Sequence, residues 1–273
     1  MRFRLMLAAA LVAVAGLLAL AGTASAWAPA SSAAVHPGVM TFTGGAQCTA
    51  NFIFSDGAST YIGQAAHCSG TGGSTETNGC DSASLPVGTQ VDVDGASKPG
   101  TMVYNSWVTM QQAGETDPDT CQYNDLALVK LDPADVANVN PSVPYWGGPT
   151  GLGGTTAQGD KVYSYGNSSL RGGVATLSPK TGLSLGTDSG GWNHTVYTVT
   201  PGIPGDSGSG FLDKSGRAFG ILSTVAIAPL AGSNGVGDLA NELSYLHAHT
   251  SFGGVQLVNG TEAFNGGKLP IGG

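Results

Sequence analysis

Short apolar runs separated by glycine-rich turns dominate this sequence. The chain of 273 residues contains 44 glycines and only 10% charged residues, and valine, threonine and tyrosine are frequent in its apolar runs. β-Branched and aromatic residues favour strands, whereas glycine, asparagine and aspartate favour the turns between them. Long helical periodicities are few. The sequence therefore predicts an all-β fold of short strands joined by tight turns.

The first 26 residues have the pattern of a secretory signal peptide. Arg2 and Arg4 precede an uncharged apolar stretch from Leu5 to Ala21, and Ala24-Ser25-Ala26 places small residues at alternate positions. We expect cleavage after Ala26 and a secreted, extracellular protein with no stable membrane association. An uncleaved membrane anchor is the alternative interpretation.

The acidic balance of the chain limits the class of partner. The mature chain of about 247 residues would carry eight basic and eighteen acidic residues, a formal net charge of about −10. Nucleic acids and anionic membranes are bound through clustered lysine and arginine, so we expect neither as a partner. The length suffices for one domain of two β-barrels.

The segment from Thr198 to Phe211, TVTPGIPGDSGSGF, contains the candidate nucleophile. A serine among glycines suits a tight turn in which backbone N–H groups approach a reacting oxygen. Ser207 would need a base to activate its hydroxyl and a third group to orient that base. His67 in YIGQAAHC and Asp125 in YNDLALVKL supply those residue types. Taken singly, each of the three also has a structural interpretation, as a turn serine, a core histidine or a strand-opening acid.

These three segments together resemble the signatures of the chymotrypsin-like (trypsin-fold) serine proteases. That family carries AAHC around its base, DLAL or a similar sequence around its orienting acid, and GDSGSG or GDSGGP around its nucleophile, in the chain order His, Asp, Ser. The resemblance implies two six-stranded antiparallel β-barrels with a short C-terminal helix. It also implies a secreted serine endopeptidase of the bacterial type, acting on a protein or peptide substrate without a cofactor.

The resemblance assigns a role to each candidate residue. His67 would take the proton of the Ser207 hydroxyl and later give it to the leaving group, while Asp125 would hold the imidazole tautomer. The backbone N–H groups of Gly205 and Ser207 would form the oxyanion hole.

The resemblance also implies where the substrate side chain binds. Pro201 stands at the base of the pocket, where trypsins have an acid, so we do not expect a preference for lysine or arginine. Ser223, Thr224 and Val225 resemble the strand that pairs with the substrate backbone. Val225 stands where larger pockets have glycine, and we expect a shallow apolar pocket for small or medium aliphatic side chains.

Four cysteines follow the signal sequence: Cys48, Cys68, Cys80 and Cys121. An even number in a secreted chain indicates two disulfides, for which the residues alone allow three connectivities. Zinc binding is the alternative, but the sequence has no C-x-x-C pair, and we expect no metal site. The resemblance implies Cys48–Cys68, behind the base histidine, and with it Cys80–Cys121.

One departure from the family concerns Asp206, the acid before the candidate nucleophile. In animal members the mature chain begins with an IVGG-like segment whose ammonium group pairs with that acid, and no such segment occurs here. We therefore expect Asp206 to pair with an internal cation. Arg171 in NSSLRGG is the best candidate.

The expected organisation follows the order of the chain. Six strand-like runs fit the first barrel, at 39–44, 50–56, 59–66, 89–95, 101–110 and 125–131. Five fit the second barrel, at 160–166, 172–179, 192–200, 208–213 and 218–228, and the sequence does not place its sixth strand. Residues 114–120, GETDPDT, are expected to form a solvated loop, with a calcium site as the alternative. Asp238 is expected to cap a helix with Leu239, Leu243 and Leu246 on one face. The segments are a signal peptide at 1–26, a flexible arm at 27–38, a protease domain at 39–250 (barrel one 39–131, linker 132–150, barrel two 151–237, helix 238–249) and an extension at 251–273, surface-packed or loose.

Two further functions are compatible with the sequence. A catalytically weak or inactive protease-like binding or adhesion protein would explain the missing activation segment and the unmatched pocket. An acyl hydrolase acting on esters would use the same nucleophile. In each case we expect a monomer.

Overall fold

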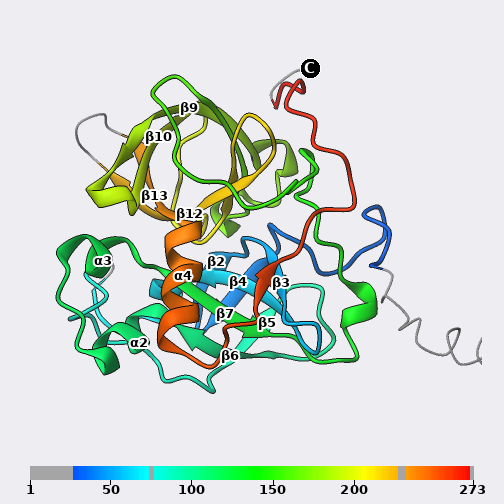
Figure 1. Cartoon of the computed structure of the whole chain (residues 1–273). Coiled ribbons are helices and arrows are strands. Elements are labelled where there is room, and N and C mark those ends of the chain that lie inside the picture. The colour runs from blue at the N-terminus through cyan, green and yellow to red at the C-terminus, as the bar shows by residue number, and fades with distance from the viewer. Residues whose placement is uncertain (1–26, 74–76, 227–231, 271–273) are drawn as a thin grey trace, which may run out of the picture.

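The computed structural model describes residues 27–73, 77–226 and 232–270, so the predicted signal peptide lies outside the described residues. Two antiparallel β units lie one above the other (Figure 1). The first is built from residues 40–130 with one late strand at 256–257, and the second is built from residues 161–238. None of the helices in the described ranges is both long and apolar enough to cross a membrane.

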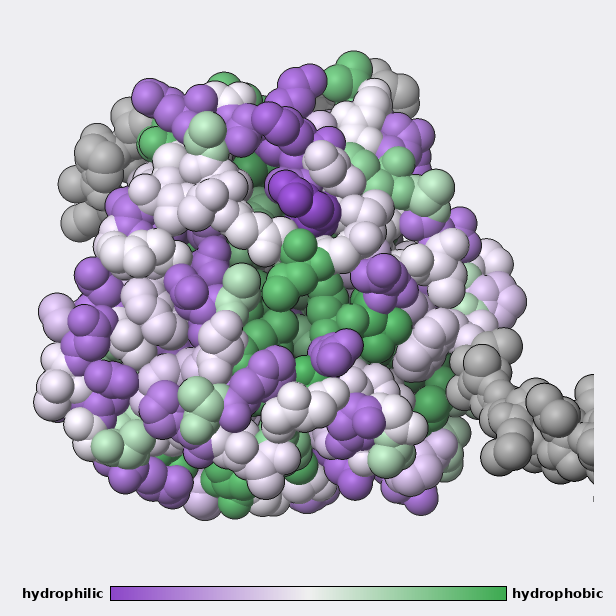
Figure 2. Space-filling view, in the orientation of Figure 1, coloured by the Kyte–Doolittle hydropathy of each residue, from purple (hydrophilic) through white to green (hydrophobic). Residues whose placement is uncertain are grey.

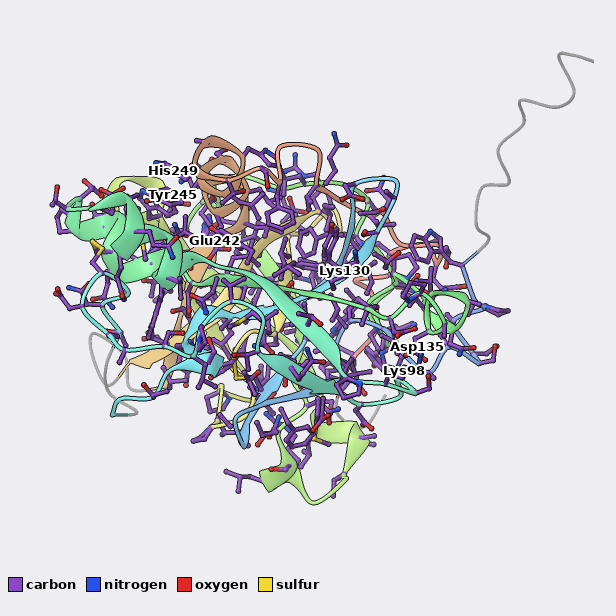
Figure 3. The ribbon with its side chains drawn as sticks, turned by 90° about the horizontal axis from the view of Figure 1, so that it is seen from below. Lys98, Lys130, Asp135, Glu242, Tyr245 and His249 are labelled. Carbon is purple, nitrogen blue, oxygen red and sulfur yellow. A yellow bond between two sulfur atoms is a disulfide. The ribbon has the colours of Figure 1, made fainter. Side chains whose placement is uncertain are left out.

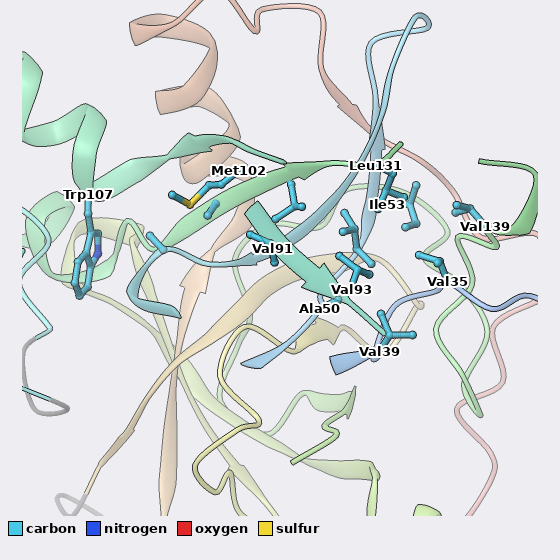
Figure 4. Packing of buried hydrophobic residues seen from close by; sticks show 14 of the residues in the cluster. Val35, Val39, Ala50, Ile53, Val91, Val93, Met102, Trp107, Leu131 and Val139 are labelled. Carbon is cyan, nitrogen blue, oxygen red and sulfur yellow. The ribbon is translucent and has the colours of Figure 1, made fainter. Parts of the chain in front are cut away.

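The first unit, barrel one, is an eight-stranded antiparallel sheet. Its core is mostly aliphatic, because alternate strand positions carry valine, isoleucine, alanine and methionine that face inward (Figure 4). Ile62 pairs with Val129 at the centre of the sheet. The strands in spatial order are β14 (Gln256–Leu257), β3 (Ile53–Ser55), β4 (Thr60–Ala65), β7 (Leu126–Lys130), β6 (Gly100–Asn105), β5 (Gln90–Val93), β1 (Met40–Thr43) and β2 (Ala46–Thr49).

The second unit, barrel two, is a closed barrel of six antiparallel strands around a small core that includes Phe211 and Phe219. The all-β fold with two units and a C-terminal helix confirms the expected fold class, although barrel one is an eight-stranded sheet where a six-stranded barrel was expected. The strands in spatial order are β10 (Asn193–Thr198), β13 (Ser233–Asp238), β12 (Ala218–Ala226), β11 (Gly210–Leu212), β8 (Lys161–Tyr165) and β9 (Pro179–Asp188).

Barrel two differs from the expectation at two strands. The expected strand at 172–179 instead contains the 3-10 helix η4 (Ala175–Leu177), because Gly172 and Gly173 adopt positive φ angles of 60° and 78° that a strand does not accommodate. The sheet continues instead in β9, where glycine and serine weaken the strand signal. The strand that the sequence left unplaced is β13, SNGVGD, whose polar residues are all buried.

Two short helices interrupt barrel one. The run from Thr101 to Met110 was expected to be one strand, but the strand ends at Asn105, whose side chain accepts the Val108 N–H and caps α2 (Ser106–Ala113). Helix α3 (Pro118–Tyr123) begins after Asp117, which accepts the Thr120 N–H. Part of the loop expected at 114–120 is therefore helical.

Helix α4 (Leu239–His249) is the expected C-terminal helix. Asp238 accepts the Asn241 N–H, and Leu239, Leu243 and Leu246 are buried. The helix packs against β12, β13 and α2, and so it lies between the two units (Figure 1).

Both end segments are packed on the domain. Residues 27–38 were expected to be flexible, but Val35 is fully buried and forms a β-bridge with Val139 in the linker. Residues 251–270, which we call the C-terminal strap, run from barrel one to barrel two (Figure 1). Figure 2 shows this face, on which apolar residues gather in the middle and polar residues surround them.

The strap contacts barrel one, the linker and barrel two. Strand β14 pairs with β3 of barrel one, and Val255 is fully buried. Thr261 donates its N–H to Ser142 of the linker. Phe264 meets the ring of Tyr163 in barrel two edge-to-face, with 5.2 Å between centroids. The extension at 251–273 is therefore surface-packed over the part that the structure describes.

Candidate active site

The predicted base and the predicted orienting acid are hydrogen-bonded to each other. His67 lies in the 3-10 turn η1 (Ala66–Ser69) directly after β4, and Asp125 lies directly before β7, the neighbour of β4. His67 Nδ1 donates to Asp125 Oδ2 at 2.7 Å, and the His67 backbone N–H donates to Asp125 Oδ1 at 2.9 Å. Because β4 and β7 pair in register, the two side chains meet although 58 residues separate them.

Ser223 completes the environment of the acid. Its hydroxyl donates to Asp125 Oδ2 at 2.6 Å, so the same oxygen accepts from His67 and from β12 of barrel two. The side chain of Asp125 is 2% exposed and that of His67 is 25% exposed. The imidazole can therefore be reached from the surface while its partner is shielded from water.

The environment of His67 determines the direction in which its pKa shifts. Partial removal from water lowers this pKa, but the charge of Asp125 and its hydrogen bond outweigh that effect. The pKa of His67 is therefore raised above its ordinary value of 6.5. An imidazole in this state holds a transferred proton more firmly than a free one does.

The predicted nucleophile lies against the end of β4 from which His67 follows. The Ser207 carbonyl accepts the Thr49 N–H at 2.8 Å, and the Gly208 N–H donates to Leu222 O at 2.7 Å. A Cβ at Gly208 would lie 2.7 Å from Ala65 N, and its φ is +85°, so only glycine fits there. This close approach sets Ser207 at the seam between the two units, with β4 on one side and β12 on the other.

No hydrogen bond joins Ser207 Oγ to His67 among the described residues, where the only hydrogen-bond partner of the His67 ring is Asp125. Such bonds are often long before substrate binds and shorten in the complex.

Two backbone donors of the Ser207 loop are free. Among the described residues, the N–H groups of Gly205 and Ser207 have no acceptor, whereas the intervening Asp206 N–H donates to Ile203 O. The Gly205 carbonyl is turned away and accepts from Gln47 Nε2 at 3.0 Å and from Thr49 Oγ1 at 2.7 Å. Two unpaired N–H groups one residue apart can bind one oxyanion.

Asp206 is held by two internal cations. Its carboxylate is fully buried and pairs with Arg171, as expected, and also with Lys180 at 2.9 Å. Lys180 is 1% exposed and donates in addition to the carbonyls of Thr200 and Pro201, at 3.2 and 2.8 Å. Burial lowers the pKa of Lys180, and Asp206 opposes that shift. Lys180 was not expected at this site, because it lies in β9, a strand that was not predicted.

The segments expected to form the substrate pocket lie together. A Cβ at Gly202, next to Pro201, would be 3.1 Å from Val225 Cγ2 and 2.6 Å from Asn234 Oδ1. Val225 is 49% exposed and Pro201 is exposed. Asn234, which the sequence did not single out, is buried and accepts the Gly202 N–H at 3.0 Å. Thr224 Oγ1 faces Gly235 of β13.

Both expected disulfides are present. Cys48–Cys68 joins β2 to the residue after His67, with 6.1 Å between Cα atoms, and Cys80–Cys121 joins the loop before β5 to α3, with 5.2 Å. All four sulfurs are paired, and the described residues contain no free cysteine.

A surface hollow of about 390 Å³ on barrel one contains none of the predicted site residues. Lys98, Lys130 and Asp132 are among the residues that line it, and Figure 3 labels the two lysines. The candidate residues Ser207, His67 and Asp125 lie at the seam between the two units instead.

Comparison with known proteins identifies the fold. No protein-family model matches the chain, and no curated protein sequence matches it. The crystal structure of Thermobifida fusca Protease A is similar over 84% of this chain and 100% of that one, with 21% identity and a TM-score of 0.54. Nocardiopsis protease matches over 82% of this chain and 98% of its own, with 16% identity and a TM-score of 0.48.

The two-unit β fold is thus that of the bacterial chymotrypsin-like serine proteases. At 21% identity this likeness establishes the fold.

Proposed function

We propose that this protein is a secreted serine endopeptidase. Ser207 attacks the carbonyl carbon of a peptide bond while His67 takes the hydroxyl proton, and His67 then gives that proton to the leaving amine. Water hydrolyses the resulting acyl-enzyme by the same route. Asp125 holds the imidazole so that Nε2 faces the serine, and it stabilises the imidazolium form.

The observation that carries this proposal is the Asp125–His67 pair beside the Ser207 loop. A shielded carboxylate bonded to Nδ1 of a partly exposed histidine fixes both the tautomer and the direction of the ring. His67 must be neutral to accept a proton, and its pKa is raised. Activity should therefore rise with pH through a value above 6.5.

The loop geometry supports a second part of the mechanism. The free N–H groups of Gly205 and Ser207 would stabilise the tetrahedral oxyanion, and removing one such donor costs roughly 10²–10³ in rate in other enzymes. The buried ion pairs of Asp206 with Arg171 and Lys180 hold the Ser207 loop in this conformation.

The proposed substrate is a protein or peptide with a small or medium aliphatic side chain at the cleaved bond. Val225 Cγ2 and Asn234 Oδ1 both lie close to Gly202, so they would narrow the proposed pocket and line it with an apolar group and a neutral amide. Neither residue offers a charge to lysine, arginine or glutamate. A peptide-library profile dominated by those residues would contradict this assignment.

The test uses two separate samples of the mature protein: one is labelled at the active site with a fluorophosphonate, and the other, unlabelled, digests a broad peptide library. Wild type and Ser209→Ala should react stoichiometrically and cleave peptides, and Ser207→Ala should do neither. Ser209 is the matched control because it is a buried serine of the same loop whose hydroxyl has no partner among the described residues.

The second candidate function is a protease-like binding or adhesion protein that hydrolyses nothing. The observation in its favour is that, in the described part of the chain, the His67 ring bonds to Asp125 and not to Ser207. Wild type that folds but takes up no label would support it, whereas label uptake with ester but no peptide cleavage would support an acyl hydrolase.

A further inference from the structure

A second buried carboxyl group lies directly behind Asp125. Glu242 projects from the first turn of α4, is fully buried, and its Oε1 accepts the Asp125 backbone N–H at 3.0 Å. Figure 3 shows Glu242 on this helix, with Tyr245 and His249 farther along it. Asp125 is thus held at its main chain by Glu242 and at its carboxylate by His67 and Ser223.

Within the described ranges, no cation forms an ion pair with Glu242. The titratable groups that face it are Asp125 at the start of β7, Asp238 at the end of β13 and Tyr104 on β6. Burial first, and then these two carboxylates, raise the pKa of Glu242 well above its ordinary value of 4.5.

The atoms of Glu242 have unequal environments. Oε1 has its donor, whereas Oε2 and the nearby Tyr104 hydroxyl are buried without a partner among the described residues. A carboxylate would leave Oε2 charged and unpaired in the interior, which is costly. A carboxylic acid carries a proton on that oxygen and keeps Oε1 as the acceptor for Asp125.

We propose that Glu242 is a positioning residue that holds the main chain of Asp125 as a neutral acid. This inference rests on the proposed function, because Asp125 matters only if His67 acts as the base. A neutral side chain fixes Asp125 without adding charge. An ionised one would add a negative charge behind the Asp125–His67 pair and would favour the imidazolium.

Two substitutions of Glu242 should have different effects on kcat. Glu242→Gln keeps the acceptor and the shape and removes the ionisable group, so kcat and the pKa of His67 should match those of wild type. Glu242→Ala removes the acceptor and frees the Asp125 backbone, so kcat should fall roughly ten- to a hundredfold with KM unchanged, as expected for a small misplacement of the base. Ser244→Ala, an exposed position of the same helix, is the control.

The experiment measures kcat and KM from pH 5 to 10 and titrates the His67 ring protons by NMR in each variant. A pKa of His67 that is clearly lower in Glu242→Gln than in wild type would show that Glu242 is ionised, and would overturn the proposal. Wild-type kcat in a folded Glu242→Ala variant would also overturn it. If Glu242→Ala does not fold, the Gln variant still decides the charge state.

The NMR titration also separates this inference from the proposed function. It reports the charge next to Asp125 whether or not the protein cleaves peptides. Wild type without hydrolysis or label uptake would end the endopeptidase assignment. The charge state of Glu242 would still be measured.

Discussion

Asp206 shows how a buried acid in this protein is balanced from within the domain. Its carboxylate also accepts the backbone N–H groups of Ser168 and Ile203, at 3.2 Å each. Arg171 and Lys180 supply two positive charges from different segments of barrel two. The carboxylate is therefore satisfied by cations and by the main chain of the loops on either side.

Because two cations share Asp206, we expect non-additive losses of stability when both are substituted. Arg171→Ala and Lys180→Ala should each lower the free energy of unfolding by about 1–3 kcal/mol, because one cation remains in each case. The double variant should lose more than the sum, because Asp206 is then buried and unpaired. Its kcat should also fall, since the Gly205 and Ser207 N–H groups lose their support.

Both effects are measured by urea unfolding and peptide hydrolysis of wild type, the two single variants and the double variant. Lys161→Ala, at an exposed position of β8, should change neither. Wild-type stability and activity in Arg171→Ala would show that this pair does not hold the loop.

The candidate site residues differ in how far the sequence reveals them. Ser207, His67 and Asp125 were found because each lies in a short local motif. Lys180 and Asn234 contact the loop only because β9 and β13 fold beside it, and those strands are rich in glycine and serine, so no periodicity marks them. Glu242 was not identified, because a glutamate in the first turn of an amphipathic helix is an ordinary feature and gives no sign of burial.

Helix α4 begins at a carboxylate with two partners. Asp238 Oδ1 accepts the Asn241 N–H at 2.8 Å, and Oδ2 accepts from His194 Nε2 at 2.8 Å. His194 is fully buried in β10, and its other nitrogen lies 3.0 Å from each of the hydroxyls of Thr156 and Thr187. One side chain thus starts the helix and satisfies a buried histidine of barrel two.

This double contact predicts a graded loss of stability. Asp238→Ala should lower the free energy of unfolding by about 2–4 kcal/mol, because a helix cap and a charged hydrogen bond are lost together. Asp238→Asn keeps an oxygen for the cap and should cost less. Thermal unfolding of both variants, with Asp160→Ala of an exposed ion pair as control, checks the order. Equal losses for Ala and Asn would contradict it.

Local signals explain which elements the sequence predicted. The Asp238 cap and the spacing of leucines predicted α4, and the strand-like runs predicted most of barrel one. The end of β6 at Asn105 was missed because apolar residues continue into α2 and hide the change of period. Strand β14 has only two residues and exists because β3 offers it an edge.

At the scale of the whole molecule, the strap adds a further connection between the two units, besides the seam and helix α4. It adds a strand to barrel one, bonds to the linker and packs an aromatic ring on barrel two. Tyr163 also donates its hydroxyl to Gly266 O at 3.1 Å. These contacts oppose separation of the two units.

Substitutions in the strap should therefore weaken the whole domain. Val255→Ala and Phe264→Ala should each lower the free energy of unfolding by about 2 kcal/mol, since buried apolar contacts are lost on both units. Leu269→Ala, at a residue 68% exposed, should stay within about 0.5 kcal/mol of wild type. Urea unfolding followed by tryptophan fluorescence measures these changes, and wild-type stability of Phe264→Ala would show that the strap is dispensable for barrel two.

The internal partners of Asp206 also matter to anyone who handles this protein. Because Arg171 and Lys180 already pair with Asp206, this acid does not need the α-amino group of a newly cleaved N-terminus as a partner. Affinity tags, carrier domains or display anchors fused ahead of residue 27 would then leave the Ser207 loop undisturbed.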